Sequence, residues 1–244
     1  MFEASLPADK LKLIAKTTTL VDDGTFIANN EKIILQEMPP GKIAMIDLEV
    51  PAEFFDKYSC DREAAFRIDL TELRKVVNRL KSENVTLQLD KKNNRFRIIA
   101  KGVFERFFEL PLLSEENTER KTTKIPSVAN ITLDPSVLKT AIQDIKQFSD
   151  FAEFIADKHS LVIQGYNHNH EVGTRILEND DCVISYNVAE QCKALYPINF
   201  LEDFIKVDGD MATIAFATDM PLKLEYALPD NAKVTYYLAP RRER

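Results

Sequence analysis

Glycine is scarce in this sequence, since only six of the 244 residues are glycine and they are not clustered. A loop that cradles nucleotide phosphates needs clustered glycines, because side chains would keep the phosphate away from the backbone N–H groups. The sequence therefore excludes a glycine-rich phosphate or dinucleotide loop, and chemistry driven by a bound nucleotide is not expected.

Cysteine is also rare. The sequence has three cysteines, Cys60, Cys182 and Cys192. Because this number is odd and no two of them form a C-x-x-C motif, neither a disulfide framework nor a zinc ribbon is predicted. We expect free thiols in the protein core and a reducing compartment.

Long apolar runs are missing as well. No stretch approaches the roughly 18 residues of a membrane-spanning helix, and no cationic segment with a following apolar run opens the chain. A formal net charge of −7 excludes a uniformly basic coat for nucleic acid. With 45% hydrophobic and 29% charged residues, the chain predicts one large or two ordinary globular domains, soluble and intracellular.

The main positive feature is an internal repeat. Residues 26–36 match residues 154–164 at a spacing of 128, each with an apolar start, a polar turn and a β-branched strand. Residues 68–72 precede residues 198–202 by 130, which places Asp69 and Asn199 at predicted helix N-caps. The spacing barely drifts along the chain, so two similar domains are predicted.

The predicted fold class is α+β, with two sheet-rich domains that carry two helices each. We place the N-terminal domain at residues 1–113, an interdomain connector at 114–126 and the C-terminal domain at 127–244. The connector has no apolar side chain to bury before residue 125, which is typical of a solvated linker.

The predicted helices separate cationic from apolar side chains. In the second helix, apolar residues at 73, 76, 77 and 80 share one face, and basic residues occupy the opposite face. The fourth helix breaks the pattern, because it exposes acidic residues at 202 and 203. The outward cations of the first three helices are Lys12, Lys16, Lys75, Arg79, Lys139 and Lys146.

Lysine and arginine populate any solvated helix face, so each helix taken alone needs no functional explanation. Together they are more informative, because an acidic chain that gathers cations on repeated helices can attract phosphates and remain soluble. No helix-turn-helix, zinc finger or aromatic platform accompanies these faces. We therefore expect contact with the backbone of a polyanion and no reading of bases.

Five segments, taken in order, resemble the proliferating cell nuclear antigen family, the sliding clamps of archaea and eukaryotes. They are MFEA at residues 1–4, LQEM at 35–38, YSCDR at 58–62, MPLKLEY at 220–226 and YYLAP at 236–240. Each segment is weakly specific, but their order, their spacing and the internal repeat extend the similarity over essentially the whole chain.

The resemblance implies the DNA clamp fold, in which three identical subunits close into a six-domain ring whose helices line the hole. It implies a non-enzymatic processivity factor without a cofactor or metal, which encircles double-stranded DNA regardless of sequence during replication and repair. The implied partners are DNA polymerase, the clamp loader, flap endonuclease and DNA ligase, bound through short peptide motifs. The expected location is the cytoplasm of an archaeon or the nucleus of a eukaryote.

The resemblance also implies residue roles. Phosphates would be contacted by Lys12, Lys16, Lys75, Arg79, Lys139, Lys146 and Lys206. Pairing of edge strands between subunits, which removes exposed sheet edges, would involve Phe104, Arg106, Phe108, Val172, Thr174, Arg175 and Ile176. A partner motif of glutamine, an aliphatic residue and two aromatics would enter a pocket of Met38, Ile43, Ile125, Pro126, Pro197, Pro221, Tyr237, Leu238, Ala239 and Pro240.

Three alternatives stay open at this point. His168, His170 and Glu171 resemble part of a metal site, and residues 180–182 group two carboxylates with a thiol. Polar turns explain both clusters more simply, because His159 is the only other histidine. The chain is otherwise a subunit of a heterotrimeric ring, or a non-catalytic interaction scaffold with the clamp fold.

Overall fold

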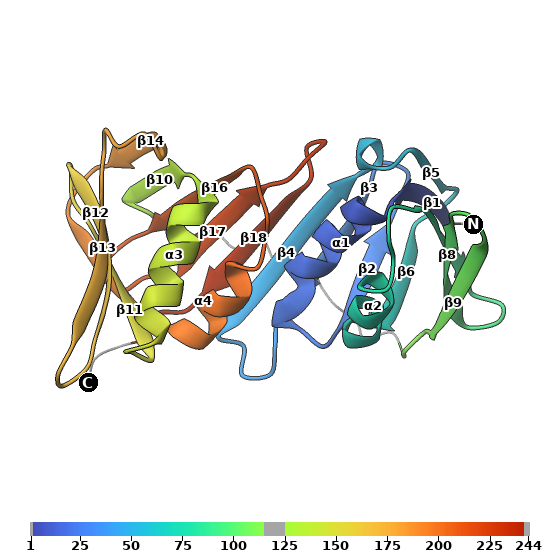
Figure 1. Ribbon diagram of the computed structural model, residues 1–244, viewed down its shortest axis with the longest axis horizontal. Coiled ribbons are helices and arrows are strands. Elements are labelled where there is room, and N and C mark those ends of the chain that lie inside the picture. Colours follow the sequence, from blue (N-terminus) through green and yellow to red (C-terminus); the bar gives the residue numbers. More distant parts are fainter. Residues whose placement is uncertain (1, 115–124, 242–244) are drawn as a thin grey trace. The chain divides into compact units, whose positions relative to one another are not determined.

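The computed structural model describes residues 2–114 and 125–241 (Figure 1). The described residues form two compact units, one made of residues 2–40, 46–114 and 229–234, the other of 41–45, 125–228 and 235–241. Most of the connector expected at 114–126 lies outside the described residues. Within the described part of the chain, no helix has the length and apolarity that membrane crossing requires.

The N-terminal half of the chain forms two sheets and two helices. Five strands lie in the order β5-β1-β7-β8-β9, and four lie in the order β4-β3-β2-β6. Their bounds are β1 (Phe2–Pro7), β2 (Asp23–Ala28), β3 (Lys32–Glu37), β4 (Ala44–Pro51), β5 (Lys57–Cys60), β6 (Ala64–Asp69), β7 (Asn84–Asp90), β8 (Arg95–Lys101) and β9 (Glu105–Pro111). The helices are α1 (Ala8–Thr17) and α2 (Leu70–Val77), which pack against each other.

The C-terminal half repeats this topology. Its strand orders are β14-β10-β16-β17-β18 and β13-β12-β11-β15, which match the first half strand for strand. The bounds are β10 (Ala129–Leu133), β11 (Phe151–Ala156), β12 (Ser160–Tyr166), β13 (Glu171–Leu177), β14 (Val183–Val188), β15 (Cys192–Pro197), β16 (Met211–Phe216), β17 (Leu222–Ala227) and β18 (Lys233–Leu238). Helices α3 (Pro135–Lys146) and α4 (Ile198–Phe204) pack side by side, which confirms the predicted repeat of sheets and helices (Figure 1).

Local sequence explains most of the helix ends. The Asp69 carboxylate accepts a hydrogen bond from the Glu72 N–H at 2.8 Å, as predicted for an N-cap. The prediction for Asn199 is wrong, because α4 already begins at Ile198 and no side chain caps it. Helix α2 is also shorter than expected, since it ends at Val77, so Arg79 lies in the turn that follows.

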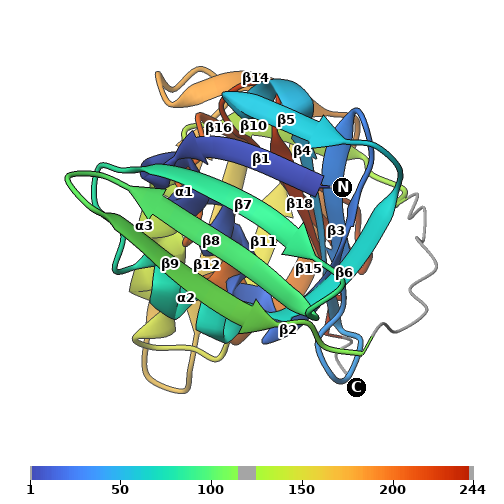
Figure 2. The same ribbon diagram turned by 90° about the vertical axis from the view of Figure 1, so that its right-hand side faces the viewer.

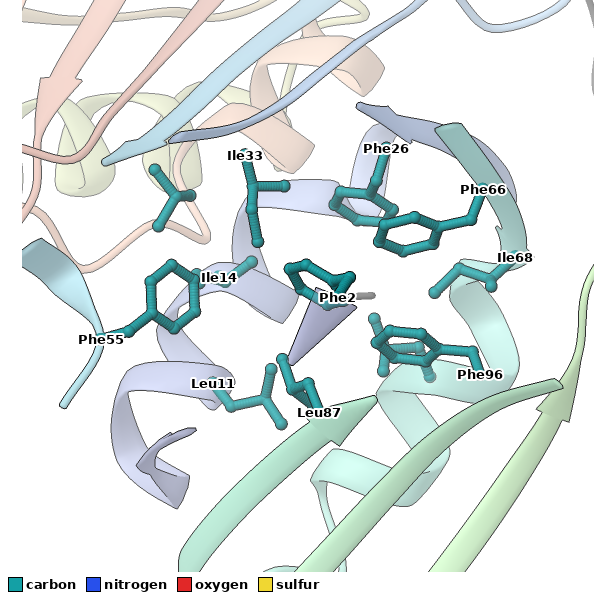
Figure 3. A pocket seen from close by; sticks show the side chains of 12 residues that line it. Phe2, Leu11, Ile14, Phe26, Ile33, Phe55, Phe66, Ile68, Leu87 and Phe96 are labelled. Carbon is teal, nitrogen blue, oxygen red and sulfur yellow. The ribbon is translucent and has the colours of Figure 1, made fainter. Parts of the chain in front are cut away.

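The core of the N-terminal unit is aromatic. The ring of Phe66 stacks between Phe26 and Phe96, with centroid distances of 5.5 and 5.2 Å, and lies 5.6 Å from the ring of Phe2. These side chains line a small apolar void of about 40 Å³, toward which α1 also contributes side chains such as Leu11 (Figure 3). Such a void is dry because it offers water no polar partner.

The cysteines are free thiols, as predicted. Cys60 and Cys192 are buried, whereas Cys182 is only half-buried. Burial raises the pKa of the Cys192 thiol to about 11, so this thiol stays protonated and unreactive at neutral pH.

Candidate functional site

The helix face of the N-terminal unit carries four of the predicted phosphate-binding cations. The Lys12 ammonium lies 3.0 Å from the Asp9 carboxylate one turn earlier in α1, and Lys16 is exposed near the end of the same helix. In α2 the Lys75 ammonium lies 2.7 Å from Glu72, and this hydrogen bond raises the pKa of Lys75. Lys75 is therefore charged at every physiological pH and points into solvent.

Arg74 also lies on α2, but its role differs from that of these outward cations. Its guanidinium donates to the backbone carbonyls of Thr18 and Val21 at 2.8 and 3.1 Å and to the Thr71 hydroxyl at 2.9 Å. These bonds tie α2 to the segment that follows α1. Arg74 therefore holds the two helices together.

In the C-terminal unit, the lysines of the helix face lie close to carboxylates. The Lys146 ammonium pairs with Glu202 of the neighbouring helix, and the Lys206 ammonium lies 2.6 Å from Asp203. Glu202 and Asp203 are the acidic residues of the fourth helix for which the sequence indicates no function. They neutralise the charges of these two lysines. Lys139 lies 4.0 Å from the Asp208 carboxylate.

Two strands at sheet edges carry the residues expected between subunits. β9 pairs only with β8, and β13 pairs only with β12, so each has one side without a strand partner in the described chain (Figure 2 for β9). Exposed apolar side chains accompany the first edge, with Phe104 at 70% and Phe107 at 65% exposure. Both edges are available for strand addition.

The seven residues predicted for this pairing do not all project to solvent. Ile176 is 2% exposed, so its side chain belongs to the core of its own unit and only its backbone lies at the edge. Phe108, Val172 and Thr174 are half-buried, whereas Arg175 is exposed.

Arg106 is positioned by contacts within its own unit. Its guanidinium donates to both Glu83 carboxylate oxygens at 2.7 and 2.6 Å and to the Arg79 carbonyl at 3.3 Å. The hydrogen bond from Arg106 lowers the pKa of Glu83, so the carboxylate is ionised and holds the guanidinium beside β9. Sequence reasoning missed Glu83, which lies 23 residues from Arg106.

The structure brings together part of the predicted partner pocket. The Ala239 N–H donates to the Ile43 carbonyl at 2.8 Å, and the Ile43 side chain is 45% exposed. Leu238 is fully buried, so it supports the surface from below and cannot contact a partner directly. Pro126 is exposed, and the remaining residues of the set are half-buried, namely Met38, Ile125, Pro197, Pro221, Tyr237 and Pro240.

A surface hollow with a volume of about 490 Å³ lies in the C-terminal unit. One of its lining residues, Arg241, directly follows Pro240 in the sequence. Its lining includes Lys193, Leu195, Asp219, Met220 and Arg241. The Arg241 N–H donates to the Leu195 carbonyl at 2.7 Å, and its guanidinium stacks 3.9 Å from the ring centre of Phe151. Sequence reasoning missed this hollow, because its lining comes from four separate segments of the chain.

The histidine side chains do not come together at one site. His159 faces Glu178 at 3.2 Å, and the ring of His170 packs 5.6 Å from that of Phe148. Among the described residues, no three histidine, cysteine or acidic side chains are grouped as metal ligands would be.

Comparisons with known proteins agree with the family resemblance that the sequence shows. Residues 1–105 match the family model described as proliferating cell nuclear antigen, N-terminal domain. A DNA polymerase sliding clamp of Thermococcus fumicolans is 31% identical over 233 residues, which cover 95% of this chain and 94% of that protein.

Two solved structures share the fold. The crystal structure of PCNA from Thermococcus kodakaraensis matches with a TM-score of 0.93 at 26% identity, covering 99% of this chain and 100% of that one. A chain of the PCNA2–PCNA3 complex from Sulfolobus tokodaii matches with a TM-score of 0.90 at 20% identity and the same coverage.

Proposed function

The chain belongs to the proliferating cell nuclear antigen family of DNA sliding clamps, and we propose that it encircles duplex DNA as a non-catalytic processivity factor inside the cell. The observation that carries the proposal is that β9 in the first half and β13 in the second, the strands matched by the family's pairing edges, each lie at a sheet end with one side unpaired within the described residues. Two different edges allow head-to-tail pairing of identical subunits, and such pairing closes into a ring when the rotation fits.

We propose a homotrimer, with the heterotrimer as the second candidate. The homotrimer is supported because a single chain supplies both kinds of edge, with exposed Phe104 and Phe107 at one and exposed Leu177 at the other. The heterotrimer is supported by the Sulfolobus tokodaii relative, whose structure is a complex of two different clamp proteins.

The proposed contact with DNA is loose and independent of sequence. Lys12, Lys16, Lys75 and Arg79 of the N-terminal helices, with Lys139, Lys146 and Lys206 of the C-terminal unit, would exchange contacts with phosphates. Ion pairs at a surface contribute at most about 1 kcal/mol each, so such contacts break easily. A ring needs no stronger grip, because its closed topology keeps it on the DNA while it slides.

The proposed partners are a DNA polymerase, a clamp loader, a flap endonuclease and a DNA ligase. The name of the relatives, DNA polymerase sliding clamp, supports the first of these. The exposed Ile43 beside Ala239 supports an apolar docking site for a short peptide motif.

Retention on DNA tests the proposal. The purified assembly is threaded onto linear duplex, and its loss is compared when the ends are left free and when they are blocked by bulky protein. We expect retention only with blocked ends. Equal loss from both substrates would contradict encirclement.

The double variant Lys75→Glu with Arg79→Glu tests the proposal that the cations of the helix face contact DNA phosphates. Reversing these charges is expected to weaken DNA binding and to flatten its salt dependence without changing the mass of the assembly, because fewer phosphates are neutralised. Lys158→Glu with Lys233→Glu, on exposed residues away from the helices, is the control of equal charge. An unchanged salt slope in the first variant would reject the assignment.

A further inference from the structure

The cations of the C-terminal helix face are already engaged by acids of α4. Lys146, at the end of α3, pairs with Glu202, and Lys206 pairs with Asp203 (Figure 1 for α3 and α4). The lysine side chains are 48% and 52% exposed, whereas the acids are 30% and 26% exposed. The acids therefore sit deeper, and the ammonium groups stay accessible to a polyanion.

The two helix pairs differ in charge. Lys139 lies near Asp208, so the three candidate cations of the C-terminal unit face three carboxylates and their formal charges cancel. Within their bounds, α1 and α2 together hold five basic and two acidic residues, whereas α3 and α4 together hold two basic and three acidic residues. The N-terminal helices thus carry the stronger positive field.

We propose that Glu202 and Asp203 limit the grip of the clamp on DNA by occupying Lys146 and Lys206 in place of phosphate. This inference rests on the proposed function. The two acids are affinity-determining residues that do not touch DNA themselves. They act through the lysines that they hold.

The physical reason is an exchange of ion pairs. A lysine that leaves its carboxylate for a phosphate gains one ion pair and loses another, and the released carboxylate then repels nearby phosphates. The carboxylate also takes up a counterion when its lysine leaves. That uptake offsets the counterion release that normally drives binding to DNA and makes it dependent on salt.

Neutralising the acids tests the inference. Glu202→Gln with Asp203→Asn keeps the side-chain shapes and removes both charges. Binding of the assembled protein to a short labelled duplex is followed by fluorescence anisotropy between about 50 and 200 mM salt. We expect affinity to rise roughly threefold to tenfold, and the plot of log affinity against log salt to steepen by up to about two.

Three further variants separate this effect from others. Glu49→Gln with Glu225→Gln removes two acids that pair with lysines on strands, at 3.0 and 2.9 Å, and so changes the net charge equally. Adding Lys146→Gln and Lys206→Gln to the test variant is expected to abolish the gain. Glu202→Gln alone is expected to give about half of it, and this variant replaces the double one if the latter assembles poorly.

The outcomes are distinct. A gain confined to the helix acids and dependent on the two lysines supports the inference. An equal gain in the strand control assigns the effect to net charge and overturns it, as does no gain in a correctly assembled variant. If the wild-type protein is also not retained on end-blocked duplex, the proposed function itself fails, and the inference fails with it.

Discussion

At the residue scale, the sequence shows which side chains are charged but not which partners they have. Arg74 and Lys75 are neighbours in α2, yet the first is bound to backbone carbonyls while the second is 65% exposed beside Glu72. The same holds for Arg106, whose carboxylate partner Glu83 lies in a different segment. A cation therefore counts as available for DNA only after its contacts within the chain are known.

Asp134 gives a prediction at this scale. Its carboxylate accepts a hydrogen bond from the Ser136 N–H at 2.8 Å at the start of α3, and hydrogen bonds from the Ser136 side chain and from this N–H lower the pKa of Asp134. Asp134→Ala is expected to lower the free energy of unfolding by about 1 kcal/mol at neutral pH, whereas Asp134→Asn keeps the cap.

The pH dependence of this effect follows from the lowered pKa. A carboxyl with a lowered folded-state pKa stabilises the fold at pH values above its unfolded pKa, about 3.9, and loses this effect as the pH falls through the folded value. The difference between wild type and Asp134→Ala is thus expected to shrink below about pH 4. Urea denaturation at fixed protein concentration measures it, and a difference that grows in acid would contradict the capping role.

At the element scale, the ends of helices and strands decide what is exposed. Helix α2 ends at Val77, which leaves Arg79 in a turn, and β18 ends at Leu238, after which Ala239 bonds to Ile43. The end of α2 at Val77 places the Arg79 side chain on a turn and not on the helix face. The end of β18 places a small residue and an exposed aliphatic one side by side.

That juxtaposition predicts peptide binding. A peptide with a glutamine, an aliphatic residue and two aromatics is expected to release heat on binding in a calorimeter, and Ala239→Glu is expected to weaken binding by tenfold or more. Leu238 is unsuitable for this test because a charge at a fully buried site would unfold the strand. Ile184→Glu, at an apolar residue that is 59% exposed on β14, is the control, and equal loss in both variants would refute the site.

At the scale of the whole molecule, the edge strands β9 and β13 are expected to determine the assembly. A free edge is an aggregation hazard unless something covers it, and a closed ring covers β9 and β13 together. The exposed apolar side chains beside β9 fit the same explanation, since they would be costly to leave in water.

Assembly gives the prediction at this scale. Light scattering of the purified protein is expected to give three times the 27.9 kDa chain mass. Phe104→Glu with Phe107→Glu is expected to reduce this to a single chain, with little change in the stability of each unit because both side chains are exposed. Ile184→Glu is expected to keep the threefold mass, and a monomeric wild type would favour the heteromeric ring.

The sequence by itself determined the repeat, the α+β class and the family. Alternating burial in strands and the N-cap at Asp69 are local effects, and a repeat is visible as recurring residues at nearly constant spacing. It also identified the strands around residues 103–108 and 171–176 through the resemblance, and both contain strands that lie at sheet edges.

Only the tertiary structure decided which charged and apolar groups are free. Glu202 pairs with Lys146, which is 56 residues away in the sequence, and Glu83 pairs with Arg106, which is 23 residues away. The Leu238 side chain is fully buried in the core. These contacts depend on how sheets and helices pack, and electrostatic interactions act through space, whatever the distance along the chain. The sequence alone therefore predicts a positive helix surface, while the packed fold shows that its C-terminal half is neutralised by its own carboxylates.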